Sequence, residues 1–454
     1  MLLMRRERPP CAARDNLCMN HQSSSAEGQG PFDALIIGAG PSGTAVASWL
    51  ANQGRRVAVL ERTVFPRFVI GESLLPLSMG HWEETGQLEA LKAQNYAIKR
   101  GARFYRDGKQ FDLAFNENFT KGWTWTWQVP RDHFDSVLAQ EAQRMGAQVH
   151  FGHEVLSVDL NHADGVEITT RHEGQEHRFT GRFLIDSSGY GGTLVKLLGL
   201  QDTPAMNGRL ALFAHVRENE EHRARYFEPM QISFEVVAQD LWFWSIPFSD
   251  GRTSIGFVGH NSHFTEAMAS GNDADALQRM LHKQKAFGDR YSNVQFVHGP
   301  QVIREYTHFN HALTGQRYVL TGNCAGFLDP VFSSGVAFAT ESGLRAAKLL
   351  HRQLNGESID WKAEYEDHIR FGAAVFHSYI DTWYDGDLQT VFFTDDVEQS
   401  HKERIVSVLA GYVWDLTNPY VSKHQKAIRL LAQSIRLRDA EREAIAARKK
   451  SSTD

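Results

Sequence analysis

A glycine-rich turn between a predicted strand and a predicted helix constrains the fold of this chain more than any other feature. The turn is Gly38-Ala39-Gly40-Pro41-Ser42-Gly43, with the apolar run Ala34 to Ile37 before it and a helix-forming segment after it. Its three glycines permit a tight turn, the approach of a pyrophosphate to backbone N–H groups, and close packing of helix on strand. Glu61 ends the next predicted strand, where its carboxylate is placed for a ribose hydroxyl. The segment therefore predicts a βαβ unit that binds a dinucleotide. The candidate contacts are Gly38, Gly40, Pro41, Ser42, Gly43 and Glu61.

Composition excludes several classes of protein. The chain has 454 residues, 42% of them hydrophobic, so it can bury a full core. Its formal net charge is −6 and its lysines and arginines form no stripe, so we expect no nucleic-acid partner. No run of about 18 apolar residues is present, so we expect no membrane span. The three cysteines have no metal-binding spacing, and their scarcity favours a reducing, cytoplasmic location.

The histidines give no support to a metal site. His150 and His153 are close in sequence, but on one strand they would point to opposite faces. The other histidines show no repeated ligand spacing. A G-x-S-x-G motif is absent, so a Ser-His-Asp hydrolase is not expected either.

The order of the predicted elements indicates an interleaved α/β fold. Asp107-Gly108 is a strong hairpin signal, Trp123 to Trp127 alternate with threonines as in a strand, and residues 210–297 are mostly strands. We expect a Rossmann-like dinucleotide-binding lobe interleaved with an antiparallel β-sheet lobe, followed by a helical C-terminal region. The last stretch, Ala427 to Lys450, is expected to form a charged amphipathic helix. The expected ranges are 1–30 for a disordered tail, 31–99, 131–204 and 316–352 for the dinucleotide-binding lobe, 100–130 and 205–315 for the sheet lobe, and 353–454 for the helical region.

Three later segments favour FAD over NAD. Gln128-Val129-Pro130-Arg131 opens a second helix and presents a cation, Leu184 to Gly189 is a strand end with a glycine loop, and Gly322 to Pro330 is a polar loop before another helix. Together they resemble the FAD-binding segments of flavoprotein monooxygenases of the hydroxybenzoate-hydroxylase type. The resemblance implies that the first lobe binds FAD, with Arg131, Asp329 and Gly335 among the contacts.

Three further segments resemble the flavin-dependent halogenases and their close relatives. They are Gly71-Glu72-Ser73-Leu74-Leu75-Pro76, the W-x-W-x-I-P run Trp242 to Pro247, and Asp329 to Gly335. The resemblance covers Asp33 to about Phe392. It implies that reduced FAD reacts with dioxygen to a C4a-hydroperoxide, that chloride or bromide attacks it, and that hypohalous acid then halogenates an electron-rich aromatic. A substrate tethered to a carrier protein or peptide fits this chemistry. Only one glycine fingerprint is present, which favours a separate flavin reductase as partner.

The tryptophans of the W-x-W-x-I-P run are candidate catalytic residues. On a strand, Trp242, Trp244 and Ile246 share one face, so two indoles form a rigid apolar wall. The resemblance implies that this wall separates the flavin from the substrate. Spacing alone favours an ordinary core strand, because aromatic stripes at this period are common in cores.

Lys99 is the main candidate for the chemistry. The resemblance implies that the lysine before this strand points into the substrate cavity, where it holds hypohalous acid by a hydrogen bond or as a haloamine. An amine whose pKa is lowered by burial suits either role. The alternative is a solvated lysine, which describes most lysines, and Lys92 or Arg100 could be the operative cation instead.

Ser334 and Gly335 begin the last helix of the FAD lobe. Free backbone N–H groups at such an end could hold a halide or receive the edge of the flavin. Of the two, we rank flavin contact above halide binding. The alternative is that a serine simply caps the helix, which requires no ligand.

Two departures from the family pattern bear on the substrate and on the cofactor. Tryptophan halogenases carry a glutamate at the position of Phe332, so free tryptophan is disfavoured and phenol- or pyrrole-type substrates are expected; Glu341 is a candidate replacement. Asn323 stands where the wider family has an aspartate, but an amide can still bind a ribityl hydroxyl. Rival functions are an aromatic monooxygenase or hydroxylase, a biosynthetic dehydrogenase, an isoprenoid-type flavin reductase, and a non-catalytic flavoprotein.

Overall fold

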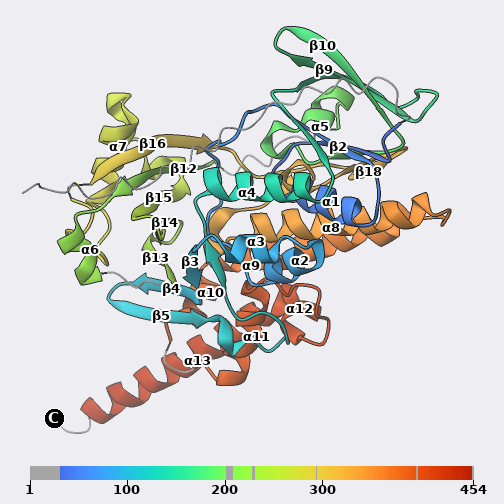
Figure 1. Cartoon of the computed structure of the whole chain (residues 1–454). Helices are drawn as coiled ribbons and strands as arrows, with labels where there is room; N and C mark the ends of the chain where they lie inside the picture. The colour runs from blue at the N-terminus through green and yellow to red at the C-terminus, as the bar shows by residue number, and fades with distance from the viewer. Residues whose placement is uncertain (1–30, 201–207, 227–230, 293, 395–396, 452–454) are drawn as a thin grey trace, which may run out of the picture.

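The computed structural model describes residues 31–200, 208–226, 231–292, 294–394 and 397–451. The tail expected over residues 1–30 lies outside them. A six-stranded sheet forms one lobe, a seven-stranded sheet forms the second, and a group of C-terminal helices packs beneath the seven-stranded sheet (Figure 1). This arrangement confirms the expected α/β fold with a helical C-terminal region.

The six-stranded sheet carries the glycine turn. Its strands run in the order β18-β19-β11-β1-β2-β7 and are parallel except for the edge strand β18. The central strands are fully buried, as in parallel sheets covered by helices on both faces. The strands are β1 (Ala34–Ile37), β2 (Val57–Glu61), β7 (Gln148–Phe151), β11 (Leu184–Asp186), β18 (Thr314–Gly315) and β19 (Tyr318–Leu320). The long helices of this lobe are α1 (Pro41–Asn52), α4 (Arg131–Arg144) and α8 (Gly335–Leu354).

Two positions of the turn between β1 and α1 require glycine. Gly38 has a φ of +95°, and a Cβ there would lie 2.6 Å from the carbonyl oxygen of Ser187. A Cβ on Gly43 would lie 1.9 Å from the carbonyl oxygen of Gly38, because α1 packs directly against the turn. Gly38 and Gly43 therefore have the tight-turn and close-packing roles that the sequence predicts for them.

The seven-stranded sheet has the order β16-β12-β15-β14-β13-β4-β5 and is antiparallel except for the β13–β4 pair. The hairpin at Asp107-Gly108 is confirmed, since both residues have positive φ and join β4 to β5. The strands are β4 (Gly101–Arg106), β5 (Lys109–Ala114), β12 (Arg209–Arg217), β13 (Gln231–Ala238), β14 (Leu241–Pro247), β15 (Arg252–His260) and β16 (Gln295–Arg304).

A short ribbon joins the two lobes. It consists of β3 (Ala97–Lys99) and β6 (Thr126–Gln128), with Ser73 bridged to Gln128 as a third edge. The strand expected over Trp123 to Trp127 was therefore wrong at residues 123–125. Within this run only Thr126 and Trp127 pair with a neighbouring strand, β3.

The remaining elements complete the lobes. The strands β8 (Glu154–Asp159), β9 (Val166–His172) and β10 (Gln175–Gly181) form a three-stranded sheet, and β17 (His308–Phe309) pairs with β20 (Gly326–Phe327). The shorter helices before residue 300 are α2 (Leu77–Thr85), α3 (Leu88–Lys92), α5 (Thr193–Leu198), α6 (Glu220–Tyr226) and α7 (Asp273–Leu281).

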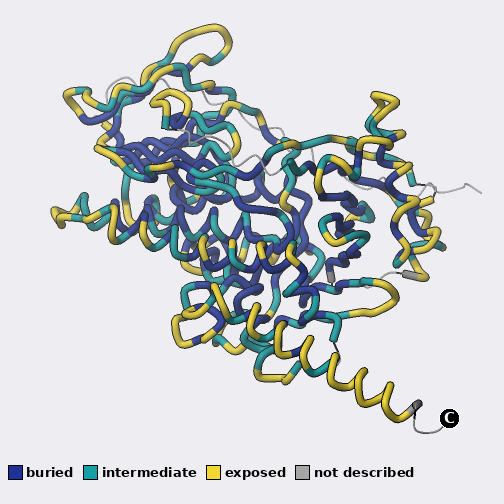
Figure 2. Tube along the Cα trace, turned by 180° about the vertical axis from the view of Figure 1, so that it is seen from behind, coloured by how far each residue is buried: buried dark blue, intermediate teal, exposed yellow. Residues whose placement is uncertain are grey.

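The C-terminal helices are α9 (Asp367–Tyr384), α10 (Asp387–Phe392), α11 (Gln399–Leu409), α12 (Pro419–Ser422) and α13 (His424–Ser451). They share one hydrophobic core with the seven-stranded sheet. The first half of α13 buries Ile428, Ala432 and Ile435, while its second half leaves the body and is exposed (Figure 2). The expected C-terminal helix is confirmed.

The expectation that His150 and His153 point apart was wrong. Strand β7 ends at Phe151, and Gly152 turns the chain with a φ of +77°, so the two rings lie 5.5 Å apart. In the described ranges no group of three or more His, Cys, Asp or Glu side chains could hold a metal ion. Among the helices of the described residues, none is long and apolar enough to cross a membrane.

Candidate functional site

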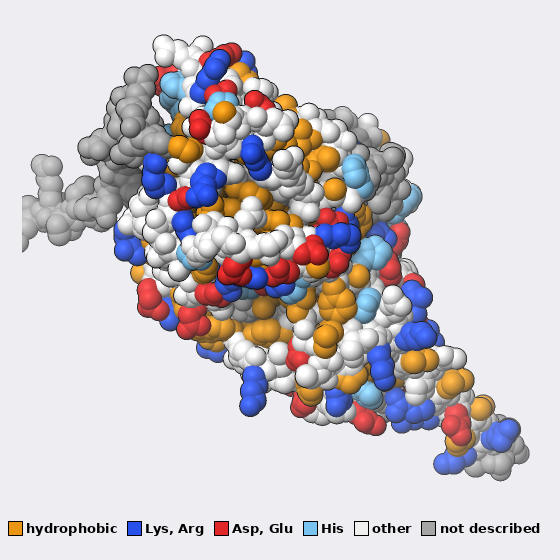
Figure 3. Space-filling view, turned by 90° about the vertical axis from the view of Figure 1, so that its right-hand side faces the viewer, with side chains coloured by type: hydrophobic (Ala, Val, Ile, Leu, Met, Phe, Trp, Pro, Cys, Tyr) orange, Lys and Arg blue, Asp and Glu red, His pale blue; other side chains and the backbone are white. Residues whose placement is uncertain are grey.

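A cavity of about 410 Å³ lies between the two lobes. At one end it is lined by the glycine turn, Glu61 and the loop Ser187 to Gly191, and at the other by apolar residues of the seven-stranded sheet. Figure 3 shows apolar side chains gathered between charged ones on one face of the molecule. The predicted residues that line this cavity are Gly38, Gly40, Pro41, Ser42, Glu61, Arg131, Trp242, Trp244 and Gly335. The fold therefore brings together most of the candidates from both lobes.

The glycine turn leaves an open cradle. Gly40 is the N-cap of α1, which has no side-chain cap, and the nearest atom to a Cβ built on Gly40 is Arg67 Nη2 at 3.5 Å. An uncapped helix N-terminus facing free space suits a phosphate. Glu61 accepts hydrogen bonds from the backbone N–H groups of Ala39 and Thr63, both at 2.9 Å, which fixes its carboxylate at the rim. These residues fit the ADP half of FAD.

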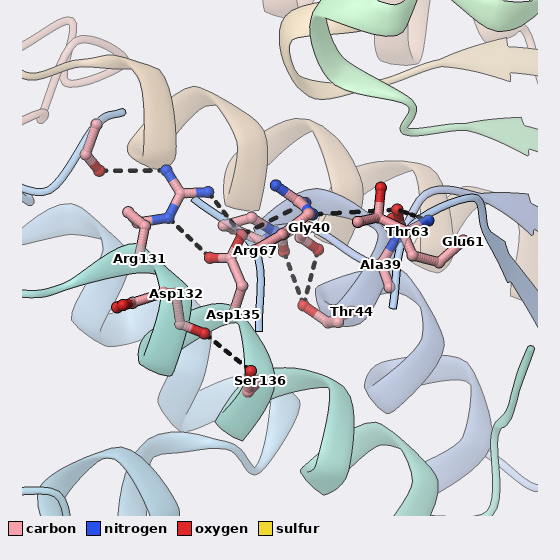
Figure 4. Close-up of polar contacts among 12 residues, drawn as sticks. Ala39, Gly40, Thr44, Glu61, Thr63, Arg67, Arg131, Asp132, Asp135 and Ser136 are labelled. Carbon is pink, nitrogen blue, oxygen red and sulfur yellow. Dashed lines mark hydrogen bonds and ion pairs between the residues drawn. The ribbon is translucent and has the colours of Figure 1, made fainter. Parts of the chain in front are cut away.

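Two arginines lie beside the cradle (Figure 4). Arg131, at the start of α4, donates to both oxygens of Asp135 at 2.7 and 3.0 Å and to two backbone carbonyls of the segment before Glu72. Arg67 lies 3.5 Å from Asp135 and 4.0 Å from Glu61, next to Gly40. Arg67 was not among the candidate residues predicted from the sequence.

The indoles of Trp242 and Trp244 form part of the apolar end of the cavity, on the same face of β14 as Ile246. Trp242 Nε1 donates to the hydroxyl of Tyr384 at 3.1 Å, and Trp244 Nε1 donates to Ser254 Oγ at 3.1 Å. Both rings are therefore anchored by hydrogen bonds as well as by packing. The ring centroids are 5.8 Å apart, so the two indoles make one continuous wall.

Asp329 is not one of the residues lining this cavity. Its buried carboxylate accepts hydrogen bonds from Tyr306 and Tyr384 and from the backbone N–H of Val331. Burial raises its pKa to about 6. The Tyr384 hydroxyl donates to Asp329 and accepts from the Trp242 indole N–H. Asp329 therefore supports Trp242 through Tyr384 in this structure.

Lys99 is buried, with 2% of its surface exposed, in contrast to a solvated lysine. Its amine donates to the carbonyl of Leu74 at 2.8 Å and lies 5.3 Å from the centre of the Phe115 ring. Burial lowers its pKa to about 7. Lys99 does not line the cavity, but Ser73, the neighbour of its hydrogen-bond acceptor, does.

The start of α8 divides between two pockets. Gly335 lines both the main cavity and a smaller pocket of about 60 Å³ beside it, whereas Ser334 lines the smaller pocket and not the main cavity. Glu341 lies outside the main cavity and pairs with His81 at 2.9 Å and with His368 at 2.8 Å. Its carboxylate is therefore committed to a buried network and is not placed to replace the glutamate missing at Phe332. Asn323, the other departure, lines the main cavity.

Comparison with known proteins decides the family. The tryptophan halogenase family matches residues 33–123 and 106–412. The chain belongs to the tryptophan halogenase family. With this membership, the cradle and the cavity, the chain is an FAD-dependent oxidoreductase.

Three relatives illustrate the likeness. The 1H-pyrrole-2-carbonyl-[peptidyl-carrier protein] chlorinase of Pseudomonas fluorescens is 25% identical over 407 residues, covering 84% of this chain and 90% of that protein. A solved structure described as a flavoprotein/dehydrogenase from Cytophaga hutchinsonii is 39% identical, with a TM-score of 0.85 over 90% of this chain and all of that one. The myxobacterial chondrochloren halogenase is 27% identical, with a TM-score of 0.70 over 90% of this chain and 98% of that one.

Proposed function

We propose that this enzyme is an FAD-dependent halogenase acting on an electron-rich aromatic of the phenol or pyrrole type. Two relatives, named as a chlorinase and a brominase of pyrrole-2-carbonyl groups on a peptidyl-carrier protein, support a carrier-tethered substrate. Phe332 at the position of the glutamate of tryptophan halogenases supports a substrate other than free tryptophan. The scarcity of cysteines supports a cytoplasmic location, and the single fingerprint supports a separate flavin reductase as partner.

The observation that carries this proposal is that one continuous cavity reaches from the glycine cradle to the indole wall. Gly38, Gly40, Pro41, Ser42 and Glu61 would hold the ADP half of FAD, with Gly43 packing α1 against the turn. Gly335 would meet the flavin edge, and Ser334 with Gly335 would hold the halide. Arg131 would hold the backbone of Ile70 and Gly71, to which it donates two hydrogen bonds, beside the cofactor. When bound, reduced FAD supplies the electrons that activate dioxygen.

The indole wall and Lys99 would have separate roles in the reaction. Trp242 and Trp244 would keep a bulky aromatic away from the flavin, because both indoles are anchored and cannot swing aside freely. Lys99 would hold hypohalous acid through a hydrogen bond or as a haloamine, since an amine with a pKa of about 7 is available in its neutral form near neutral pH. In this structure the amine donates to the carbonyl of Leu74 and does not line the cavity, so the proposed role requires the amine to leave that carbonyl.

The decisive experiment follows the reoxidation of bound flavin. The flavin is reduced anaerobically and mixed with oxygenated buffer, with and without bromide, while its absorbance is recorded. A halogenase shows bromide-dependent reoxidation kinetics and brominates a test aromatic such as phloroglucinol, detected by the bromine isotope pattern. Reoxidation that is indifferent to bromide, without a brominated product, would refute the proposal.

A dehydrogenase is the second candidate, because the Cytophaga hutchinsonii flavoprotein/dehydrogenase is more similar in sequence to this chain than the pyrrole chlorinase or the chondrochloren halogenase is. A hydroxylase or an isoprenoid-type flavin reductase would use the same cavity. Steady NADPH oxidation without halide, and full activity of Lys99→Ala, would favour these functions. If the bound flavin could not be turned over by any reductant in the presence of oxygen, the chain would be a non-catalytic flavoprotein.

A further inference from the structure

The two arginines beside the glycine cradle differ in how far their hydrogen-bonding groups are used. A guanidinium has five N–H donors. Arg131 spends four of them, two on Asp135 and two on the carbonyls of Ile70 and Gly71. Its side chain is 7% exposed, and Arg131 is itself the first residue of α4. Arg131 therefore has little capacity left for a ligand.

Arg67, in contrast, keeps its N–H donors available for a ligand. Across the described part of the chain it makes no hydrogen bond, and its ion pairs with Asp135 and Glu61 are long, at 3.5 and 4.0 Å. Strong charge-assisted bonds between an arginine and a carboxylate measure about 2.7–2.9 Å. Its side chain is 20% exposed and rests on the Phe65 ring at 4.8 Å.

The two acidic neighbours of Arg67 already have better partners. Both oxygens of Asp135 accept from Arg131, and both oxygens of Glu61 accept from backbone N–H groups. Arg67 is thus a surplus cation held beside satisfied anions. Its Nη2 atom lies over Gly40 at the uncapped N-terminus of α1, as Figure 4 shows. A cation and a helix N-terminus facing the same space are complementary to a doubly charged anion.

We propose that Arg67, not Arg131, is the cation that binds the pyrophosphate of FAD. On binding, Arg67 exchanges its two long ion pairs for direct hydrogen bonds to phosphate oxygens. Arg131 and Asp135 then act as a fixed clamp, which holds the backbone at Ile70 and Gly71 beside the cofactor. The inference depends on FAD binding but not on halogenation.

The test measures nucleotide binding to flavin-free protein, without any turnover. ADP, FAD and riboflavin are titrated calorimetrically into wild type, Arg67→Gln and Arg67→Lys. Arg67→Gln is expected to weaken ADP and FAD binding about tenfold to hundredfold, the usual value of a hydrogen bond to a charged group. Riboflavin, which has no phosphate, is expected to bind equally well to all variants, and Arg67→Lys is expected to recover part of the loss. Arg144→Gln, a surface arginine of α4 paired with Glu141, is the matched control and should bind as wild type does.

Each alternative result has a distinct meaning. Unchanged ADP affinity in Arg67→Gln overturns the proposal, and so does an equal loss of riboflavin binding, which would indicate damage to the fold. Loss of ADP binding in Arg131→Gln but not in Arg67→Gln would assign the phosphate to Arg131. A wild-type protein that binds neither ADP nor FAD would refute the cofactor itself rather than the role of Arg67.

Discussion

His215 Nε2 lies 2.7 Å from a carboxylate oxygen of Glu72, and both side chains are about 1% exposed. The pair joins strand β12 of the seven-stranded sheet to the segment that lines the cavity. His215 Nδ1 has no hydrogen-bond partner within the described ranges, so this contact is the one polar bond of the imidazole there. Two segments that are distant in sequence, one from each lobe, are thus held together beside the cavity.

Removal of one partner of this pair should destabilise the protein strongly. Glu72→Leu and His215→Phe are each expected to lower the free energy of unfolding by about 3–5 kcal/mol, because the partner is left buried and unpaired. Urea unfolding followed by tryptophan fluorescence measures the change. His263→Phe removes a more exposed pair with Asp240 and should cost no more than about 1 kcal/mol. Equal small losses in all three variants would contradict this account.

The two glycines of the cradle should respond differently to alanine. Gly43→Ala places a Cβ 1.9 Å from a backbone oxygen, so we expect poor folding, with a loss of several kcal/mol. Gly40→Ala meets nothing closer than 3.5 Å, so the protein should fold normally but bind FAD at least tenfold more weakly. Thermal unfolding and quenching of flavin fluorescence separate the two effects. Gly80→Ala, with no atom within 4 Å, is the control and should keep full FAD affinity.

Lys99 should make stability depend on pH. The pKa of its amine is about 7 in the folded protein and near its ordinary value of 10.5 when unfolded, so the unfolded chain binds more protons between these values. Stability should therefore rise as pH increases from 7 toward 10, by a few kcal/mol. Lys99→Met should flatten this rise and be more stable than wild type at pH 7. The same variant should keep FAD but lose halogenation; retention of halogenation would remove Lys99 from the mechanism.

The histidine cluster at the edge of the FAD lobe should limit stability in acid. Burial, followed by the charges of His150, His172 and His177, lowers the pKa of His153 to about 4. The unfolded chain therefore takes up a proton on this residue between about pH 6.5 and 4 while the folded protein does not, so stability falls as pH falls through that window. His153→Phe should reduce the loss by about 1–2 kcal/mol in unfolding experiments at pH 7 and pH 4.5. An equal loss of stability in wild type and His153→Phe between pH 7 and pH 4.5 would contradict this account.

Local patterns predicted the parts of the fold that depend on neighbouring residues. The glycine turn, the Asp107-Gly108 hairpin and the shared face of Trp242 and Trp244 all follow from spacing within one or two elements. The alternation around Trp125 failed as a strand because pairing depends on a partner strand, and β3 is only three residues long.

The roles of several side chains could not be predicted because distant residues decide them. The pairing of Glu72 with His215 spans 143 positions. Asp329 lies in the polar loop that the family resemblance links to flavin, yet its carboxylate accepts a hydrogen bond from Tyr384, 55 positions later. Arg67 stands out only when Asp135 and Glu61 are seen to be already satisfied.

The carbonyl of Leu74 that receives the Lys99 amine belongs to the same stretch of backbone that begins at Arg67. One short stretch thus reaches both the glycine cradle and the buried amine of Lys99. A change in this stretch at either of the two places is therefore expected to alter the other as well.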